Sequence, residues 1–400
     1  MKEIIRNKYL LELNKYKDKP FIKILIGIRK CGKSTILMQF INTIKKNDNI
    51  IFLDFNDYST VQLIKSKDDL HNFINSKYKK NTQNYIIIDE IQEIKDFQQV
   101  LNSWINIINV DIYITGSNSK LLSSEISTLI TAKNIKINVF PLSFAEFYEY
   151  STNELKLNKT DSFNNYFKYG GMPGRLYWDE EIQIWKYLNM IYTDILQHDI
   201  LNREKINNIK EFSNIYYFLQ DNLGKETSIK NIANYLVTNN SSNITAPIVS
   251  KYLNLLISCF LLQEISEYDI SGKKILVNKN KYYPMDIGLR NSITKNFINN
   301  RGKILESIIL NELLINNYDV KIGKGRNINE IDFIAVKNSN KIYIQICEYL
   351  TEEIRNREIN NLLSINDNFP KLILSLDSFN SKDEKGIEYM NIIDWLLLNK

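Results

Sequence analysis

The 400-residue sequence has only three cysteines, and they stand far apart at Cys31, Cys259 and Cys347. A disulfide framework or a cysteine zinc site needs closely spaced or more numerous cysteines, so neither is expected. The two histidines, His71 and His198, are too few for a metal site built on imidazoles. Isolated cysteines are typical of proteins in a reducing compartment, and we predict a cytoplasmic location.

Long apolar runs are absent as well. No stretch approaches the ~18 apolar residues that span a bilayer. The first residues, MKEIIRNKYLLELNKYKDK, are charged throughout and contain no signal-peptide core. We therefore expect no membrane partner. An excess of one charge is also missing, with 51 basic against 46 acidic residues. A surface that binds nucleic acid must therefore be a local basic patch.

Hydrophobic residues make up 44% of the chain, enough for buried cores, and the length allows two to four domains. Residues 1–145 alternate apolar runs with segments of helical spacing, which predicts an α/β domain with a doubly wound parallel sheet. Residues 146–220 predict a helical lid or linker. Residues 221–295 have a winged-helix outline of two short helices followed by two strands. Residues 296–400 predict a second α/β domain.

A phosphate-loop pattern lies in the first of these regions. GIRKCGKS, Gly27–Ser34, matches G-x-x-x-x-G-K-[ST] between a predicted strand and a predicted helix. Its glycines let backbone N–H groups face an anion, and the helix start adds a positive dipole. Lys33 is expected to contact the β and γ phosphates of ATP, and Ser34 to bind Mg²⁺; a chance match is the alternative. The predicted nucleotide-binding residues are Gly27, Ile28, Arg29, Lys30, Cys31, Gly32, Lys33, Ser34, Thr35 and Asp89.

Two carboxylates, Asp89 and Glu90, follow a later buried strand in the motif YIIIDE. Asp89 is expected to hold Mg²⁺ together with Ser34, and Glu90 to polarise the attacking water. The following strand, in IYITGSNS, ends near Thr115 and Ser117, which are predicted to sense the γ-phosphate or to orient the water. A simple strand-ending turn is the alternative for these two residues. Glu90, Lys33, Thr115 and Ser117 are the predicted catalytic residues.

In this order, the motifs make the sequence resemble the archaeal-type AAA+ ATPases. The likeness rests on GIRKCGKS, YIIIDEIQ, ITGSNSKLLSSE, VFPLSFAEF and YGGMP, and continues through DNLGKETSIKNIANYL, YYPMDIGLR and EIDFIAVK. It implies a P-loop sheet domain, a winged-helix region, a C-terminal domain similar to restriction endonucleases, and assembly into rings or dimers. Family members commonly carry Gly-Arg where this chain has Ala132-Lys133, and lysine lacks the fork that grips a phosphate. Arg175 and Arg203 are other candidates for sensing phosphate, with structural ion pairs as the alternative.

The predicted winged helix carries a modest polar and basic set. Lys251 and Asn254 lie on its second helix, and Lys273 and Lys274 follow the turn at Ser271–Gly272. A helix that enters the major groove presents such residues to double-stranded DNA. Docking to a protein partner is the alternative.

The resemblance also implies a nuclease skeleton in residues 296–400. Nucleases of the PD-(D/E)xK type need two acids and a lysine around a divalent metal. Glu306 and Asp332 match the acids, but Gln345 and Cys347 stand where an acid and the lysine are expected. Since cysteine cannot replace that lysine, we predict a degenerate nuclease site at Glu306, Asp332 and Gln345 that serves DNA or partner binding.

The leading hypothesis is an Mg²⁺-dependent ATP hydrolase that acts as a switch or motor coupled to DNA or to a protein partner. Two alternatives remain. One is a nucleotide-bound DNA-binding regulator with little or no hydrolysis, which Lys133 favours. The other is an ATP-dependent metal nuclease, which Gln345 and Cys347 argue against.

Overall fold

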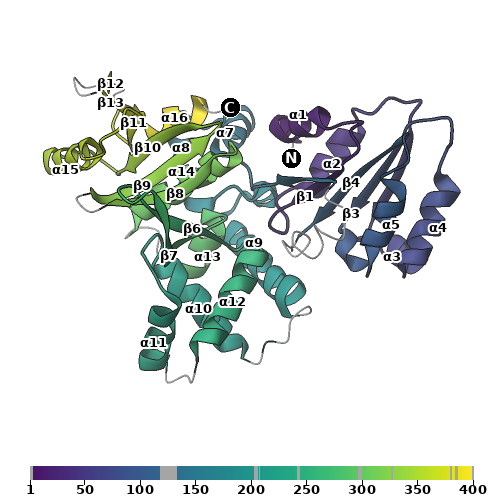
Figure 1. Cartoon of the computed structure of the whole chain (residues 1–400), viewed down its shortest axis with the longest axis horizontal. Coiled ribbons are helices and arrows are strands. Elements are labelled where there is room, and N and C mark those ends of the chain that lie inside the picture. The colour runs from purple at the N-terminus through teal and green to yellow at the C-terminus, as the bar shows by residue number, and fades with distance from the viewer. Residues whose placement is uncertain are drawn as a thin grey trace. The chain divides into compact units, whose positions relative to one another are not determined.

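The computed structural model describes residues 3–117, 133–201, 206, 208–240, 244–295, 300–325, 328–378, 381–382 and 386–398. Contacts divide the chain into two compact units. The first consists of Met1–Phe140 with Ser258–Phe260, and the second of Pro141–Ile257 with Leu261–Lys400. None of the helices in the described ranges combines the length and the apolar character that crossing a membrane requires. Figure 1 labels the elements of both units.

The first unit contains a parallel sheet, in which five strands are described, in the order β2-β3-β4-β1-β5. All four pairings are parallel, so the predicted strand–helix alternation is confirmed. The strands are β1 Ile22–Ile26, β2 Asn49–Asp54, β3 Asn84–Asp89, β4 Val110–Gly116 and β5 Asn134–Asn138. The described helices are α1 Asn7–Lys15, α2 Lys33–Ile41, α3 Tyr58–Leu63, α4 Lys67–Lys77, η1 Ile91–Glu93 and α5 Phe97–Trp104.

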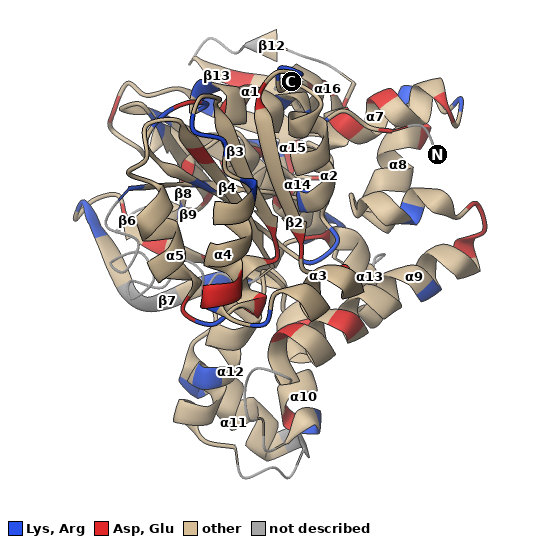
Figure 2. Cartoon of the chain, turned by 90° about the vertical axis from the view of Figure 1, so that its right-hand side faces the viewer, with Lys and Arg blue, Asp and Glu red and all other residues tan. Residues whose placement is uncertain are grey.

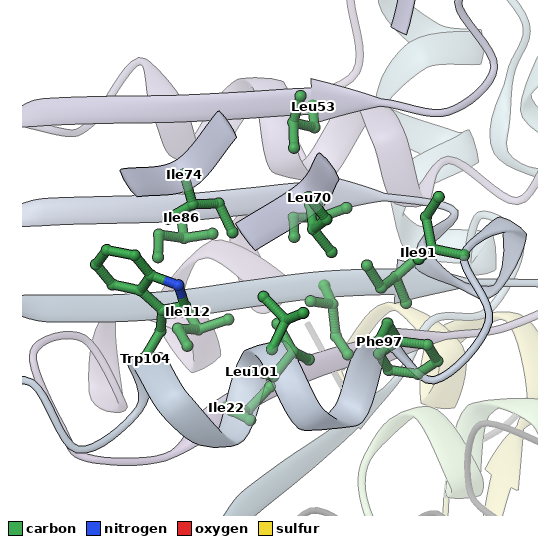
Figure 3. Packing of buried hydrophobic residues seen from close by; sticks show 14 of the residues in the cluster. Ile22, Leu53, Leu70, Ile74, Ile86, Ile91, Phe97, Leu101, Trp104 and Ile112 are labelled. Carbon is green, nitrogen blue, oxygen red and sulfur yellow. The ribbon is translucent and has the colours of Figure 1, made fainter. Parts of the chain in front are cut away.

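The core of this unit follows from strands that are apolar on both faces. Every residue of β1, β3 and β4 is buried, as expected for parallel strands that helices cover on each side. Phe40 of α2 packs against Tyr113 of β4, with tilted rings whose centroids lie 4.5 Å apart. In a second layer of packing, α4 and α5 contribute side chains that meet those of β3 and β4 in Figure 3: Leu70, Ile74, Leu101, Trp104, Ile86 and Ile112.

Polar residues at the amino ends of the strands are bonded to one another. Lys23 of β1 and Asp111 of β4 form an ion pair, and both side chains are fully buried. The remaining oxygen of Asp111 accepts hydrogen bonds from the Tyr113 hydroxyl and from the Asp18 N–H, each at 2.8 Å. This network satisfies buried charges that are costly when left unpaired. This network lies at the amino edge of the sheet and involves no residue of the carboxyl edge, where the predicted nucleotide-binding residues lie.

The second unit begins with helices that are joined through a glycine turn. Asp286 caps α13 by accepting the Leu289 N–H at 3.0 Å, and it also accepts the Gly171 N–H at 2.7 Å. A Cβ on Gly170 would lie 2.4 Å from the Asp286 carboxylate, so the turn at YGGMPG requires glycine there. The described helices are α7 Phe144–Asn153, α8 Lys159–Tyr169, η3 Pro173–Tyr177, α9 Glu181–Asp194, the π-helical η4 Ile195–Leu201, α10 Ile209–Asp221, α11 Ile229–Asn240, α12 Ala246–Ser258 and α13 Ile287–Thr294.

A mixed sheet forms the rest of this unit. Its eight described strands have the order β12-β13-β11-β10-β9-β8-β6-β7. They are β6 Leu262–Asp269, β7 Lys274–Pro284, β8 Asp319–Gly325, β9 Ile328–Lys337, β10 Asn340–Ile346, β11 Lys371–Ser375, β12 Ser381–Lys382 and β13 Ile387–Asn391. Helices α14 Arg301–Ile315, α15 Glu352–Leu363 and α16 Ile392–Leu398 accompany them.

The hairpin of the predicted winged helix belongs to this same sheet. β6 pairs in parallel with β8, with Glu267 opposite Ile322 and Asp269 opposite Lys324. The strands predicted for residues 221–295 and for residues 296–400 therefore share one ladder of hydrogen bonds. The sequence contains no sign of this continuity, and the predicted domain boundaries within the second unit stay predictions.

Candidate nucleotide site

The phosphate loop connects the end of β1 to the start of α2. Gly32 caps α2 with φ +104°, a left-handed conformation that favours glycine, and it supplies no side-chain cap. The first N–H groups of a helix form an anion site together with the positive end of its dipole. Ser34 and Thr35 are exposed at this helix start, whereas the ammonium of Lys33 is buried and donates to the carbonyls of Gly27 (3.0 Å) and Ile28 (3.3 Å).

The loop is held against the chain that leaves the sheet after β5. A Cβ on Gly27 would lie 2.0 Å from the Val139 carbonyl oxygen, so no other residue fits without a backbone shift. The Cys31 thiol is buried, donates to the same oxygen at 3.4 Å, and has a pKa that burial raises. Cys31 therefore faces inward, and only its backbone is placed to serve a nucleotide. The other predicted loop residues behave differently, with Ile28 buried, Arg29 half-buried and Lys30 exposed.

A residue that the sequence did not single out also fixes the loop. Arg6 is 2% exposed, and its guanidinium donates to the carbonyl oxygens of Cys31 at 3.1 Å and Phe140 at 3.0 Å. Its two acceptors are 25 and 134 residues away in sequence. A planar fork suits such a bridge, because it donates in two fixed directions.

The predicted acids lie at the carboxyl edge of the sheet, beside this loop. Asp89 ends β3 and is fully buried, and the Thr115 hydroxyl donates to one of its carboxylate oxygens. The same hydroxyl accepts the Glu90 N–H at 2.9 Å. The Oε1 atom of Glu90 lies 3.8 Å from the Nζ atom of Lys33. The structure thus brings four of the predicted site residues together, and Ser117 is buried directly after β4.

Burial sets the electrostatics of Asp89. It raises the pKa of this carboxyl above its ordinary value, while hydrogen bonds from Ser34 and Thr115 oppose the rise. The nearby carboxylates of Glu90 and Asp54 raise it further. A cation at this position would favour the ionised form.

The donor set fits Mg²⁺ better than a metal held by protein alone. Mg²⁺ prefers oxygen ligands and usually keeps several waters while binding one or two protein groups and substrate phosphates. The hydroxyl of Ser34 and the carboxylate of Asp89 are such ligands and interact with each other. Among the residues that the structure describes, no group of three or more His, Cys, Asp or Glu could hold a metal ion. The site therefore suits an ion that arrives with a nucleotide.

Three further polar residues line the acids. Asp54 ends β2 directly opposite Asp89 in the register. Asn56 donates to Asp54 at 2.9 Å and lies 3.5 Å from the Oδ2 atom of Asp89. Gln92 donates its amide N–H to the Oε2 atom of Glu90. The position of Asp54 at the end of a predicted strand was a usable signal, because carboxyl ends of parallel strands share one edge.

Three candidates for a phosphate-sensing cation were predicted: Lys133, Arg175 and Arg203. Lys133 precedes β5 at the amino edge of the sheet, where its backbone bonds Ile22 and its ammonium donates to Asn106 at 2.9 Å. Ala132 and Arg203 lie outside the described residues. Arg175 is buried in the second unit, where it donates to the Gly170 carbonyl at 2.8 Å, and burial lowers its pKa to about 10. The role of Arg175 in sensing phosphate stays a prediction.

The residues predicted to contact DNA are exposed in the second unit. Lys251 and Asn254 stand one helical turn apart on α12, where Tyr252 and Leu253 face the core. Lys251 is the only charged residue of α12, as Figure 2 shows by the basic colour on that helix. Lys273 and Lys274 are exposed where β7 begins. Their contact with DNA stays a prediction.

The predicted nuclease residues lie near one another in the mixed sheet and on α14. Gln345 is fully engaged there. Its carbonyl oxygen accepts the Asp332 N–H at 2.7 Å, and its amide nitrogen donates to the Glu330 carbonyl at 3.1 Å and to Glu358 at 2.6 Å. The side chain of Gln345 therefore links the backbone of β9 to Glu358.

Lysines that the sequence did not single out neutralise this cluster. The carboxylate of Glu306 accepts bonds from the Lys303 ammonium and from the Tyr283 hydroxyl. Burial, and then the charge of Glu306, raise the pKa of Asp332 well above its ordinary value, while Lys303 opposes the rise. Lys281 is nearly fully buried and pairs with the Glu330 carboxylate. The Lys303 and Glu330 side chains are 32% and 31% exposed, so this charge network reaches the protein surface.

Comparisons with known proteins agree with the geometry of the first unit. A sequence-family profile described as an AAA domain matches residues 19–148, and one described as a domain of unknown function (DUF8612) matches residues 160–299. An uncharacterized protein of Haemophilus influenzae is 34% identical over 402 residues, which cover 98% of each chain. The uncharacterized protein MJ1544 of Methanocaldococcus jannaschii is 32% identical over 394 residues, covering 93% of this chain and 85% of that one.

Solved structures resemble the chain only distantly. The Orc1 protein of Aeropyrum pernix in complex with DNA covers 73% of this chain and 91% of its own, at 10% sequence identity and a TM-score of 0.32. The Cdc6p protein of Pyrobaculum aerophilum covers 78% of this chain and 96% of its own, again at 10% identity and a TM-score of 0.32. Likenesses this low carry no argument about function.

Proposed function

Because this chain belongs to the archaeal-type AAA+ ATPases, we propose that it binds Mg²⁺–ATP at Gly27–Ser34 and hydrolyses it as a switch or motor. The observation that supports this proposal is the meeting of Lys33, Asp89 and Glu90 at one edge of the sheet, with Lys33 Nζ 3.8 Å from Glu90 Oε1. A basic group for phosphate, an acid for a cation and an acid for water are the parts that phosphoryl transfer needs.

Each residue has a defined part in this proposal. The Lys33 ammonium exchanges the carbonyls of Gly27 and Ile28 for phosphate oxygens when nucleotide binds. Glu90 accepts a proton from water while the water oxygen bonds to the γ-phosphorus, and the bond to the β-phosphate oxygen breaks to release ADP. Ser34 and Asp89 would hold Mg²⁺, which offsets phosphate charge. Thr115 keeps Asp89 and the backbone of Glu90 in register with each other.

In this proposal the second unit binds the partner and responds to the nucleotide. We propose that α12 and the turn before β7 bind double-stranded DNA or a protein partner through Lys251, Asn254, Lys273 and Lys274, which are exposed. We propose that the tail binds a partner and does not cleave DNA, because Gln345 and Cys347 stand where an acid and the lysine are expected. The lack of an acid and a lysine at Gln345 and Cys347 argues against the alternative of a metal nuclease.

A second candidate function is a DNA-binding regulator that holds nucleotide with little or no hydrolysis. Lys133 favours it, because its ammonium is bonded to Asn106 at the amino edge of the sheet, opposite the edge that bears the phosphate loop. In that position it serves neither its own nucleotide nor, without leaving Asn106, a neighbouring one. Transition-state stabilisation by an arginine finger is worth ~10³–10⁵ in turnover, so its loss makes hydrolysis slow.

One experiment tests both functions. ATP binding is measured with a fluorescent analogue, and turnover by phosphate release, for the wild type and for Lys33→Ala and Glu90→Gln, each with and without duplex DNA. Lys33→Ala should abolish tight binding. Glu90→Gln should bind like the wild type and lose turnover by roughly a hundredfold or more. Lys46→Ala, an exposed lysine beyond α2, is the matched control and should behave like the wild type.

The outcomes separate the candidates. A wild type that neither binds nor hydrolyses ATP refutes the whole reading. Tight binding without turnover in any condition selects the regulator. Turnover that DNA accelerates supports a switch or motor on DNA, and turnover indifferent to DNA favours a protein partner.

A further inference from the structure

The side chain of Glu90 is held on both of its oxygens. Gln92, in the short helix η1, donates its amide N–H to Oε2, and Oε1 lies 3.8 Å from the ammonium of Lys33. The direction of the Gln92 contact is chemically determined, because an ionised carboxylate only accepts hydrogen bonds. The nitrogen of the amide therefore bonds Glu90, and the carbonyl oxygen is left for another donor.

The backbone around Glu90 is built to bring Gln92 into this position. Glu90 has φ +55°, a left-handed conformation that is unfavourable for a residue with a Cβ. The turn is secured from both sides. The Glu90 N–H bonds the Thr115 hydroxyl at 2.9 Å, the Glu90 carbonyl accepts the Glu93 N–H at 3.2 Å, and Ile91 is fully buried in the core. A reversal of this kind turns the amide of Gln92 back onto the carboxylate two residues earlier.

The carbonyl oxygen of Gln92 is a second, independent indication. It is buried, and within the described part of the chain it has no hydrogen-bond partner. A buried polar atom without a partner is unusual in a folded protein, because leaving it unsatisfied costs free energy. Beside a carboxylate that is expected to take a proton from water, an unoccupied acceptor is a place for that same water to donate its other proton.

We propose that Gln92 is the positioning residue for Glu90. Its N–H fixes the orientation of the carboxylate, and its carbonyl accepts from the attacking water, so that the water is held between two acceptors. This assignment rests on the proposed hydrolysis of ATP. It requires no change in nucleotide binding, because the hydrogen bond that Gln92 donates goes to Glu90.

The test compares Gln92→Leu, which keeps the volume and removes both polar atoms, with Gln92→Glu, which keeps the shape and places a like charge beside Glu90. Turnover and the dissociation constant of a fluorescent ATP analogue are measured separately on the full chain. Since misplacing a catalytic group by about 1 Å costs ~10²-fold, kcat should fall roughly tenfold to a hundredfold in both variants. The dissociation constant should stay within about twofold. Gln98→Leu, a half-buried glutamine at the start of α5, is the matched control and should keep wild-type turnover.

Each outcome bears on the assignment. A lower kcat with unchanged nucleotide affinity, partly restored in Gln92→Asn, supports positioning. Wild-type or faster turnover in Gln92→Leu overturns it and leaves the proposed hydrolysis standing. A parallel loss of nucleotide affinity, or a comparable fall of turnover in Gln98→Leu, means that the substitution only disturbs the local fold, and it also overturns the assignment. A wild type that binds ATP without ever hydrolysing it refutes the proposed hydrolysis itself, and the role of Gln92 with it.

Discussion

The hydroxyl of Thr115 joins the two acids of the site, and its removal is the sharpest test of this geometry. Thr115→Val keeps the shape of a fully buried side chain and deletes one donor and one acceptor. Asp89 then loses a hydrogen bond to a charged group, worth ~1.5–3 kcal/mol, and the Glu90 N–H loses its acceptor, which costs ~1–3 kcal/mol. Because the two bonds share one atom, the costs overlap, and we expect a total of about 3 kcal/mol.

Hydrogen exchange measured by mass spectrometry reports this loss where it occurs. Peptides that contain β3 and β4 should exchange about a hundredfold faster in Thr115→Val, since every ~1.4 kcal/mol is a factor of ten in the opening equilibrium. Peptides from the mixed sheet of the second unit should exchange as in the wild type. Turnover should also fall, because the left-handed backbone of Glu90 loses the bond that secures it.

Two controls separate the hydroxyl from the methyl group. Thr115→Ser retains the oxygen and should lose only the ~0.8 kcal/mol of one buried methyl group. Thr43→Val removes a hydroxyl that bonds the Phe40 carbonyl at the end of α2, and should leave β3 and β4 unchanged. Exchange in Thr115→Val within threefold of the wild type, together with normal turnover, refutes the bridging role of Thr115.

Two other substitutions probe the frame of the site. Gly27→Ala places a Cβ 2.0 Å from the Val139 carbonyl, so affinity for a fluorescent ATP analogue should fall at least ~10-fold. Gly302→Ala, which meets nothing within 4 Å, is its control, and equal affinity in both variants contradicts the argument. Asp111→Ala leaves the Lys23 ammonium buried without its partner. The free energy of unfolding of the first unit in urea, monitored by hydrogen exchange, should fall by ~3–5 kcal/mol. The double change Lys23→Met with Asp111→Leu should recover most of that loss, and a double variant as unstable as Asp111→Ala would rule the explanation out.

The sequence was sufficient for the parts of the site that depend on neighbours along the chain. The phosphate loop, the strand that ends at Asp89, and the strand that ends at Thr115 are local patterns of apolar runs and special residues, and the structure places them at one edge of a parallel sheet. The α/β fold class and the resemblance to AAA+ ATPases are also confirmed, because both depend on such local patterns.

Contacts between distant segments were beyond that reasoning. Arg6 is an ordinary residue of a charged leader in the sequence, and only folding brings it to Cys31 and Phe140. Gln92 stands inside a quoted motif, yet its role depends on a left-handed residue that no pattern marks. Lys281 lies on β7 and Lys303 on α14. The periodicity of apolar residues does not show that these two elements lie around the predicted nuclease acids. The predicted roles of the DNA-contact residues stay predictions.

The ladder between β6 and β8 also limits how this protein can change by recombination. β6 precedes residue 296 and β8 follows it, and the two strands pair with each other. A hybrid chain joined at residue 296 would therefore leave one edge of each strand without its native partner. Long unpaired edges invite aggregation, so such hybrids are selected against. Between Phe140 and Pro141, by contrast, no strand pairing in the described sheets is broken. We expect natural relatives to exchange the residues from Pro141 onward as one piece, hairpin and tail together.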